Sequence, residues 1–290
     1  MPRALFVGLR EAARRASVVP LTSRSAVSAL ALALHGLGRH VKRHNSIRIL
    51  YYHSISHAPV RSSVSPAAFE SQVEYLVRSG HRLLSLSDAT RRLASGTPLP
   101  AKSVVVTFDD GFEDNYEYAF PVLRRFGVPA SIFLTVSYIG TDRLPTLTRT
   151  DFVPRPLNWD QVEEMHAHDI EFGSHTLTHP MLSTIPLGEV RHEIAESKRV
   201  IEDRLGTPVL FFCYPRGDFS ADVRNIVREE GYLAACTTLP GTNGRRTDPF
   251  ALRRTYVGRH DVATEFARKV EGAYDLLQRG LHAWRRLRPR

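Results

Sequence analysis

The sequence has little cysteine: only Cys213 and Cys236 occur among its 290 residues, which excludes a disulfide framework. We expect both as buried thiols rather than as a single bridge. A long apolar run is also missing. The most apolar stretch near the start, Ala26–Leu34, is about nine residues long, against the ~20 that a membrane span requires. No cleavage site of small residues is obvious before His35, so we predict neither a transmembrane span nor a signal peptide.

Acidic residues are scarce at both ends of the chain. Residues 1–48 carry a net charge of +8 and residues 279–290 a net charge of +5, which leaves −4 for the residues between them, given the total of +9. Basic ends of this kind attract anionic membranes or polymers. No nucleic-acid recognition motif accompanies them, so we expect no nucleic-acid partner. Ala26–Leu34 and its basic neighbours leave two interpretations open: a segment lying on a membrane surface, or a packed helix or disordered leader.

Apolar strands and amphipathic helices alternate over the rest of the chain without a break in composition. The run Ser103–Phe108, with three consecutive valines, is typical of a strand buried on both faces of a parallel sheet. The alternation predicts a parallel α/β sheet, and seven or eight strands favour a single (β/α) barrel, a distorted TIM-like fold. We therefore divide the chain into a basic leader (1–47), one barrel domain (48–279) and a basic tail (280–290).

Chemically unusual residues follow four of the predicted strands, where a barrel gathers its active site. These strand ends are His53, Asp109-Asp110, His175 and Tyr214-Pro215-Arg216. By itself, the Asp pair is equally consistent with a turn capped by Asp109. His175 and His179 lie four residues apart, so a single helical turn would bring both imidazoles to one side. Two histidines and one aspartate form a common open site for a divalent metal.

Two of these motifs together resemble the polysaccharide deacetylase family, which has a NodB homology domain and forms carbohydrate esterase family four. The motifs are Thr107–Gly111 (TFDDG) and His175–His179 (HTLTH), in the family's order, and the resemblance covers roughly residues 48–260. Tyr214–Gly217 (YPRG) looks like the family's third motif. Among the branches, the one that acts on poly-N-acetylglucosamine is the most similar, because it has an N-terminal Tyr-His like Tyr52-His53.

The resemblance implies a role for each matching residue. Asp110, His175 and His179 would hold a divalent metal, most simply zinc, and Asp109 would be the general base that takes a proton from a metal-activated water. A backbone N–H near Tyr214 would stabilise the oxyanion, and Pro215 and Arg216 would contact the substrate.

Two positions depart from the family's usual pattern. The late Leu-x-His motif that usually supplies the acid is missing, and Leu252-Arg253-Arg254 occupies that region. We therefore expect His53 to be the general acid. Cys213 stands where an arginine commonly orients the base, so Arg216 or Arg254 must supply that charge, and we favour Arg254. Glu113, Asp114 and Asp218 are interpreted as acids at helix starts, where carboxylates suit the helix dipole.

These observations predict a metal-dependent hydrolase that removes acetyl groups from an N-acetylated polysaccharide containing N-acetylglucosamine. The same site could instead cleave acetyl esters, as in acetylated xylan, since an alkoxide leaving group needs less help from an acid. A carbohydrate-binding protein with a degenerate site is the third alternative, although the ligands and the base are all present. We favour a cell-envelope location, periplasmic or membrane-associated, over a cytoplasmic one, which stays open, and we expect peripheral membrane contact through the basic ends.

Overall fold

The computed structural model describes residues 45–142 and 155–275. Residues 1–44 of the predicted leader, all of the predicted tail and residues 143–154 lie outside the described residues. The domain boundaries, the membrane contact and the envelope location therefore stay predictions. Within the described ranges, no helix is both long enough and apolar enough to cross a membrane.

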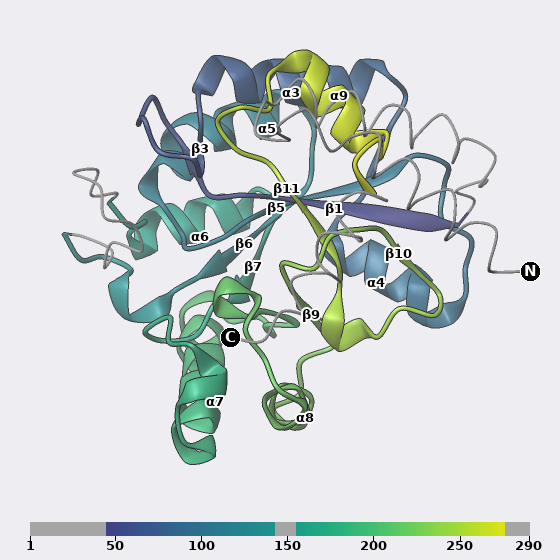
Figure 1. The fold of residues 1–290 in the computed structure, drawn as a ribbon. Helices are drawn as coiled ribbons and strands as arrows, with labels where there is room; N and C mark the ends of the chain where they lie inside the picture. Colours follow the sequence, from purple (N-terminus) through teal and green to yellow (C-terminus); the bar gives the residue numbers. More distant parts are fainter. Residues whose placement is uncertain (1–44, 143–154, 276–290) are drawn as a thin grey trace, which may run out of the picture.

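The strands form a curled, mainly parallel sheet (Figure 1). They are β1 (Ser46–Tyr52), β2 (Ser54–Ile55), β3 (Ser63–Val64), β4 (Arg82–Leu83), β5 (Ser103–Phe108), β6 (Ala130–Leu134), β7 (Ile170–Ser174), β8 (Phe211–Cys213), β9 (Ala234–Cys236), β10 (Asn243–Gly244) and β11 (Arg254–Tyr256).

Seven parallel strands close into a ring, in the order β1-β5-β6-β7-β8-β9-β11. Closure comes through Leu252, which forms a parallel bridge to Cys236 at the end of β9 and leads into β11. β11 then pairs with β1 in parallel, with Leu50 opposite Thr255. β4 adds to β5, and β10 adds antiparallel to β1, so the sheet as a whole is mixed. The predicted (β/α) barrel is confirmed.

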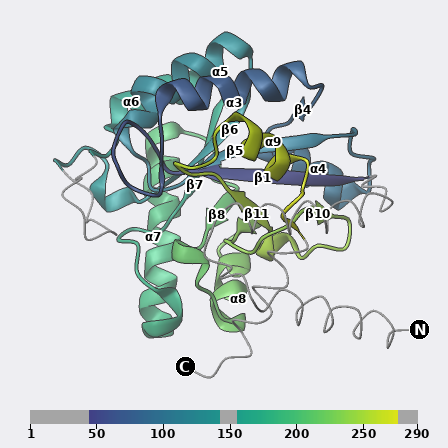
Figure 2. The ribbon, with the colours of Figure 1, turned by 45° about the horizontal axis from the view of Figure 1, so that its top comes forward.

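Helices cover the outside of the ring. They are α3 (Pro66–Arg78), α4 (Leu86–Ser95), the π-helix η1 (Asn115–Ala119), α5 (Phe120–Phe126), α6 (Trp159–Ala167), α7 (Leu187–Leu205), α8 (Ala221–Glu229) and α9 (Ala263–Val270), with short 3₁₀ turns η2 (Val136–Tyr138), η3 (Leu182–Thr184), η4 (Pro215–Gly217) and η5 (Pro249–Ala251). Figures 1 and 2 show α3, α5 and α9 on one side of the sheet and α7 and α8 on the opposite side.

The helix starts follow local capping chemistry. As predicted, Ser65 caps α3, with its side chain accepting from the Ala68 N–H, and Pro66 occupies the first turn. The start of α4 is bound by a residue that is distant in the sequence. Glu171 on β7 accepts from the backbone N–H groups of Leu86 and Ser87. A carboxylate at this position also suits the positive end of the helix dipole. These contacts attach α4 to the ring.

Alternate strand residues divide the core into two clusters. Leu50, Val104 and Val106 belong to the cluster that packs against the surrounding helices. Ile49, Val105 and, from other strands, Phe133, Phe211 and Cys213 form a smaller cluster inside the ring. This division follows from the two-residue period of a strand. Continuing the inner series 105–107 by one more step places Asp109 at the mouth, above the inner cluster.

Candidate active site

The turn after β5 sends two buried carboxylates to neighbouring partners. Asp109 and Asp110 are 3% and 4% exposed. Asp110 has a positive φ of 76°, and Gly111 has a φ of 75°. A side chain at Gly111 would begin 2.9 Å from Leu134 Cδ2, so glycine is required for both conformation and space. Because of this turn, both consecutive carboxylates face the interior of the mouth.

Asp109 forms a bidentate ion pair with Arg254, which comes from β11, the strand that pairs with the opposite edge of β1 from β5. Arg254 Nη1 lies 2.6 Å from Asp109 Oδ1, and Nη2 lies 2.7 Å from Oδ2. The guanidinium is itself buried and held by a bond from Nε to Thr237 O. Burial alone would raise the pKa of Asp109, but the charge and hydrogen bonds of Arg254 outweigh it and hold that pKa well below its usual range. Asp109 is therefore ionised at neutral pH.

The sequence left open whether Arg216 or Arg254 orients the base, and the structure places only one of them beside Asp109. Arg254 contacts Asp109, whereas Arg216 is exposed at the rim. Cys213 lies beside the ion pair, with Sγ 3.1 Å from Arg254 Nη2. Burial raises the pKa of this thiol well above its usual value, so it is neutral. The expectation that both cysteines are buried and unpaired is confirmed.

Asp110, His175 and His179 form a compact set of metal-ligating groups. Asp110 Oδ1 lies 3.5 Å from His175 Nε2 and 3.6 Å from His179 Nε2. Two ligand atoms on one tetrahedral Zn²⁺, each about 2.0–2.1 Å from the ion, are about 3.4 Å apart, so this spacing fits a shared cation. Asp109, His175 and Cys213 form an alternative cluster. It fits poorly, because both Asp109 oxygens bind Arg254 and the thiol is neutral.

The protonation of the two histidines also suits a metal. His175 Nδ1 lies 2.7 Å from the Cys213 carbonyl, which can only accept, so Nδ1 carries a proton and Nε2 is the ring nitrogen that faces the ligand set. Burial, together with the neighbouring His175, lowers the pKa of His179 to about 4, so this ring is neutral at pH 7. Among the described residues, nothing pairs with the buried His179 Nδ1.

The prediction that His175 and His179 share a helical turn is wrong: they lie in a loop. Thr176 and His179 have positive φ angles of 70° and 62°, which interrupt any helix. The loop is held by local bonds, including one from the His179 N–H to Thr176 Oγ1 at 2.9 Å. It is also held by Glu193 on α7, which accepts from the Leu177 N–H, the Thr178 N–H and the Thr178 hydroxyl. The rings still converge, with centroids 4.8 Å apart.

Backbone strain is concentrated at this mouth. Seven non-glycine residues have positive φ in the described part of the chain, and four of them are Asp110, Thr176, His179 and Arg216. Such conformations cost free energy and persist where the surroundings enforce them, often at functional sites. The clustering supports the interpretation of this region as an active site.

His53 follows β1 and lies beside the same mouth. Its ring packs near Tyr51 and Tyr256, with centroid distances of 5.7 and 6.1 Å. It is close enough to Asp109 for its charge to affect the pKa of that carboxyl. Nothing in the described part of the chain pairs with the buried His53 Nδ1. An imidazole with an unused nitrogen is suited to proton transfer.

The sequence analysis missed the residues that hold the His53 segment. Asn115 Nδ2 donates to His53 O at 2.8 Å, and Asp114 accepts from Ser54 Oγ and the Ile55 N–H at 2.5 and 3.0 Å. Asp114 is half-buried, and the partial desolvation of its carboxylate raises its pKa to about 6. No local pattern could reveal this, because the partners lie some 60 residues earlier.

Helical structure does begin at Glu113 and Asp114, directly ahead of η1, as interpreted, whereas Asp218 lies before Ser220, the N-cap residue of α8, and not at the start of that helix. Asp114 makes no side-chain cap bond to η1. Asp218 accepts from the Ser183 N–H and hydroxyl. These bonds join the Tyr214–Gly217 turn to the loop after His179. Glu113 accepts from Gln161 on α6. All three carboxylates connect separate segments around the mouth.

The Tyr214–Gly217 turn offers less to an oxyanion than predicted. The Tyr214 N–H donates to Cys236 O at 3.1 Å, and the buried Tyr214 hydroxyl donates to Phe250 O. Pro215 has no N–H. The predicted oxyanion donor near Tyr214 is therefore not the tyrosine's own N–H, which leaves the backbone of Arg216 as the next donor in this turn.

Comparison with known proteins identifies the family. The model of the family described as polysaccharide deacetylase matches residues 96–235. YxkH of Bacillus subtilis, whose name assigns it to the polysaccharide deacetylases, is 30% identical over 223 residues, or 77% of this chain and 75% of the relative. The chain belongs to the polysaccharide deacetylase family. The prediction of a hydrolase of this family is thereby confirmed.

Two further proteins named as deacetylases are also similar to this chain. The poly-beta-1,6-N-acetyl-D-glucosamine N-deacetylase of Staphylococcus aureus is 30% identical over 151 residues, and this match covers 51% of the chain and 48% of the relative. The deacetylase PplD of Streptococcus pyogenes, solved in complex with acetate, is 23% identical with a TM-score of 0.69, covering 78% of this chain and 98% of that one. The latter likeness supports the fold.

Proposed function

We propose that this protein is a metal-dependent N-deacetylase acting on a polysaccharide that contains N-acetylglucosamine. The observation that carries the proposal is the pairing of two arrangements at one mouth. Asp109, a carboxylate bound to Arg254, lies next to Asp110 and two imidazoles. The ligand atoms of Asp110 and the imidazoles have the spacing expected for donors that bind the same cation. The named activity of the Staphylococcus aureus relative supports the choice of an N-acetylated substrate.

Asp110, His175 and His179 would hold the divalent metal. Their mixed oxygen and nitrogen donors suit zinc, although other divalent transition metals accept the same set. A cation at this position supplies a Lewis acid that lowers the pKa of water and polarises a carbonyl. The Cys213 carbonyl orients His175, and Glu193 fixes the loop that carries His179.

Asp109 acts as the general base. Arg254 keeps its carboxylate ionised and holds both oxygens in a fixed direction. Asp109 takes a proton from the water that attacks the acetyl carbonyl. The pairing with Arg254 also weakens Asp109 as a base, and a bound cation would offset this by lowering the pKa of the water that loses the proton.

His53 donates a proton to the departing amine, and the backbone of Arg216 contributes to holding the oxyanion. An amine is expelled readily only after protonation, so amide cleavage depends on such an acid. The alternative of ester cleavage depends on it less. This difference separates the two reactions experimentally.

The test measures acetate release from N-acetylglucosamine oligomers and from acetylated xylan. We expect release from the oligomers to be lost with a chelator and restored by zinc, and to fall by about 10²–10⁴-fold in Asp109→Asn. His53→Ala should lower amide turnover far more than ester turnover. The control is Asp222→Asn, an exposed position in the first turn of α8. Acetate release that survives both the chelator and Asp109→Asn would reject the mechanism, and activity on xylan alone would assign an esterase.

A further inference from the structure

The segment that carries the proposed acid is bound to the segment that carries the base. Where β1 and β5 end, the Asp109 N–H donates to Tyr52 O at 3.0 Å, so the pairing of the two strands extends to the base itself. One residue further along β1, a side chain makes the connection: Asn115 Nδ2 donates to His53 O at 2.8 Å. The acid and the base therefore have a common support in residues 109–115.

Asp114 makes the next attachments. Its carboxylate accepts from the Ser54 hydroxyl at 2.5 Å and from the Ile55 N–H at 3.0 Å. It also accepts from Asn115 Nδ2 at 2.9 Å, so both N–H groups of this amide are used, one by a carboxylate and one by a carbonyl. The amide that binds His53 O is therefore itself fixed in direction.

Asn115 is the first residue of the π-helix η1. The Phe120 N–H bonds to Asn115 O, five residues earlier, and such wide turns are rare and frequently occur at functional sites. Asn115 is 0% exposed, whereas Ala119 and Phe120 nearby belong to the apolar core. Its Oδ1 has no partner within the described residues, so burial of this amide costs free energy. The contact with His53 explains the amide better than packing does.

The direction of the His53 ring depends on its backbone. The ring lies against Tyr51 and Tyr256, with centroid distances of 5.7 and 6.1 Å. Its buried Nδ1 has no partner in the part of the chain that the structure describes. Aromatic contacts restrict the ring less than a hydrogen bond would, so the backbone bond from Asn115 is the directional contact that places it.

We propose that Asn115 is a positioning residue for the general acid: its side chain holds the backbone of His53 so that the imidazole stays at the same mouth as Asp109. Asp114 assists by fixing the amide and the residues that follow His53. This proposal rests on the proposed function, since it concerns the acid of the same reaction. It predicts that changes at Asn115 affect amide cleavage far more than ester cleavage, because an amine leaving group depends on the acid.

The experiment measures acetate release by the full chain with zinc, from N-acetylglucosamine oligomers and from para-nitrophenyl acetate, an ester whose leaving group needs no acid. Asn115→Ala should lower amide turnover by about 10- to 100-fold, because a displacement of ~1 Å at a catalytic group can cause a loss of this size. Ester turnover should fall far less. In the His53→Ala background, Asn115→Ala should cause little further loss of amide turnover, because the group that it positions is gone.

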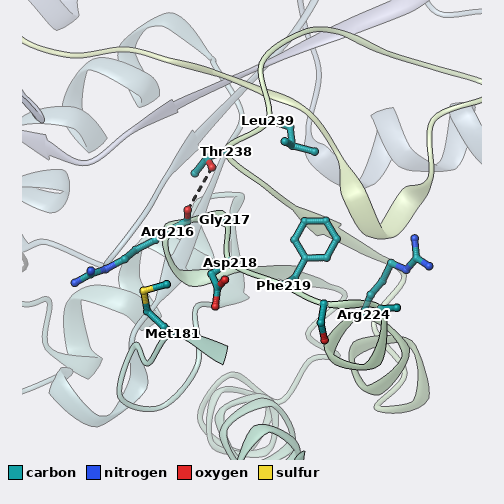
Figure 3. A pocket seen from close by; sticks show the side chains of 10 residues that line it. Met181, Arg216, Gly217, Asp218, Phe219, Arg224, Thr238 and Leu239 are labelled. Atoms are coloured by element: carbon teal, nitrogen blue, oxygen red, sulfur yellow. Dashed lines mark hydrogen bonds between the residues drawn. The ribbon is translucent and has the colours of Figure 1, made fainter. Parts of the chain in front are cut away.

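Two variants show whether this change is specific. Asn243 is also buried and donates to a backbone carbonyl, that of Arg253, but it lies at the start of β1, so Asn243→Ala should lower stability without changing the amide-to-ester ratio. In the Tyr214–Gly217 turn, the Thr238 hydroxyl donates to Arg216 O at 3.3 Å (Figure 3). Any loss in Thr238→Val should be equal for amide and ester, since both reactions pass through an oxyanion.

A smaller change keeps the test decisive where Asn115→Ala fails to fold. Ser54→Ala removes only the hydroxyl that donates to Asp114, directly after His53. It should shift the amide-to-ester ratio in the same direction as Asn115→Ala, by a smaller factor.

The outcomes separate this proposal from the proposed function. A ratio that falls in His53→Ala but not in the Asn115 and Ser54 variants, or a full additional loss in the double variant, would overturn the positioning role and leave the deacetylase standing. If the wild type releases no acetate, the deacetylase proposal fails, and NMR spectroscopy still decides the positioning role. The His53 ring signal, assigned by its loss in His53→Ala, should shift or broaden in Asn115→Ala or Ser54→Ala and not in Asn243→Ala; an unchanged signal rejects the role.

Discussion

Two carboxyl groups near the mouth, the buried Asp109 and the half-buried Asp114, have opposite shifts in pKa. Asp109 faces a guanidinium, and the pKa of its carboxyl is held low. Asp114 has only the neutral donors of Ser54, Ile55 and Asn115, and these do not offset the cost of burying its charge, so its pKa rises to about 6. The presence of a neighbouring cation therefore decides the direction of the pKa shift.

Asp114 should therefore make the stability of the protein depend on pH. Its folded pKa of about 6 lies above the ~3.9 of an unfolded aspartate, so the folded state binds the proton more tightly. The resulting stabilisation is fully present below about pH 4 and is lost as the pH rises through about 6. Relative to Asp114→Asn, the wild type should lose up to about 3 kcal/mol of unfolding free energy between pH 4 and pH 7.

Urea denaturation at several pH values measures this difference. Asp160→Asn, at an exposed position in the first turn of α6, is the control, and its difference from the wild type should stay flat. A flat difference for Asp114→Asn would contradict the assignment of a raised pKa to Asp114.

The sequence was enough to predict those site residues that belong to a local motif. The motifs around Asp109-Asp110 and His175–His179 each follow a strand, and parallel strands bring their carboxyl ends to one mouth. Asp114 and Glu193 were missed because their partners are backbone groups distant in sequence, and any exposed acid at a helix start has the same local pattern. Arg254 could be named because the usual arginine was absent and few other cations remained.

At the scale of elements, α7 supports the loop that carries the metal ligands. Glu193 lies on a helix held by buried Val190 and Ile194, and its carboxylate binds the loop through three hydrogen bonds. The helical turn predicted for His175–His179 did not form, because these bonds and the Thr176 hydroxyl satisfy the backbone in a left-handed conformation instead. The spacing of apolar residues predicted the helices and strands, but it carries no information about side chains that fix the conformation of a loop.

Glu193→Gln should weaken metal binding without unfolding the protein. The amide oxygen can still accept from both backbone N–H groups, but the negative charge that strengthens these bonds is lost, so the loop is held more weakly and His179 is less well positioned. Loss of such supporting contacts typically lowers metal affinity by about 10- to 100-fold. Competition with a zinc chelator measures the affinity. Glu189→Gln, an exposed position in the first turn of α7, is the matched control, and equal affinities in the two variants would refute the role of Glu193.

For the molecule as a whole, the strand that closes the barrel also brings a residue into the site. β11 closes the ring against β1 and carries Arg254 to Asp109, which directly follows β5. The sequence predicted the number of parallel strands, because each is an apolar run followed by polar residues. It left closure open, since the link through Leu252 is a single bridge and β11 has only three residues. The base is therefore oriented only in the closed barrel.

A second buried ion pair secures this closure, and its removal should be costly. Arg48 on β1 binds Asp275 through two bonds of 2.9 and 3.1 Å and also donates to Thr255 on β11. Both charged residues are buried. Asp275→Ala leaves the guanidinium buried without a counter-charge, which typically costs about 3–5 kcal/mol of unfolding free energy. Thermal and urea denaturation should show this loss.

The matched control for this prediction is the surface pair of Arg199 and Asp203 on α7, whose side chains are both exposed. Asp203→Ala should change the unfolding free energy by less than about 1 kcal/mol, and salt should reduce even that. Replacing both partners of the buried pair, in Arg48→Met/Asp275→Leu, should recover much of the loss, because apolar groups carry no charge to desolvate. If Asp275→Ala costs no more than Asp203→Ala, closure of the barrel does not depend on the Arg48–Asp275 pair, and the pairing of β11 with β1 alone is sufficient.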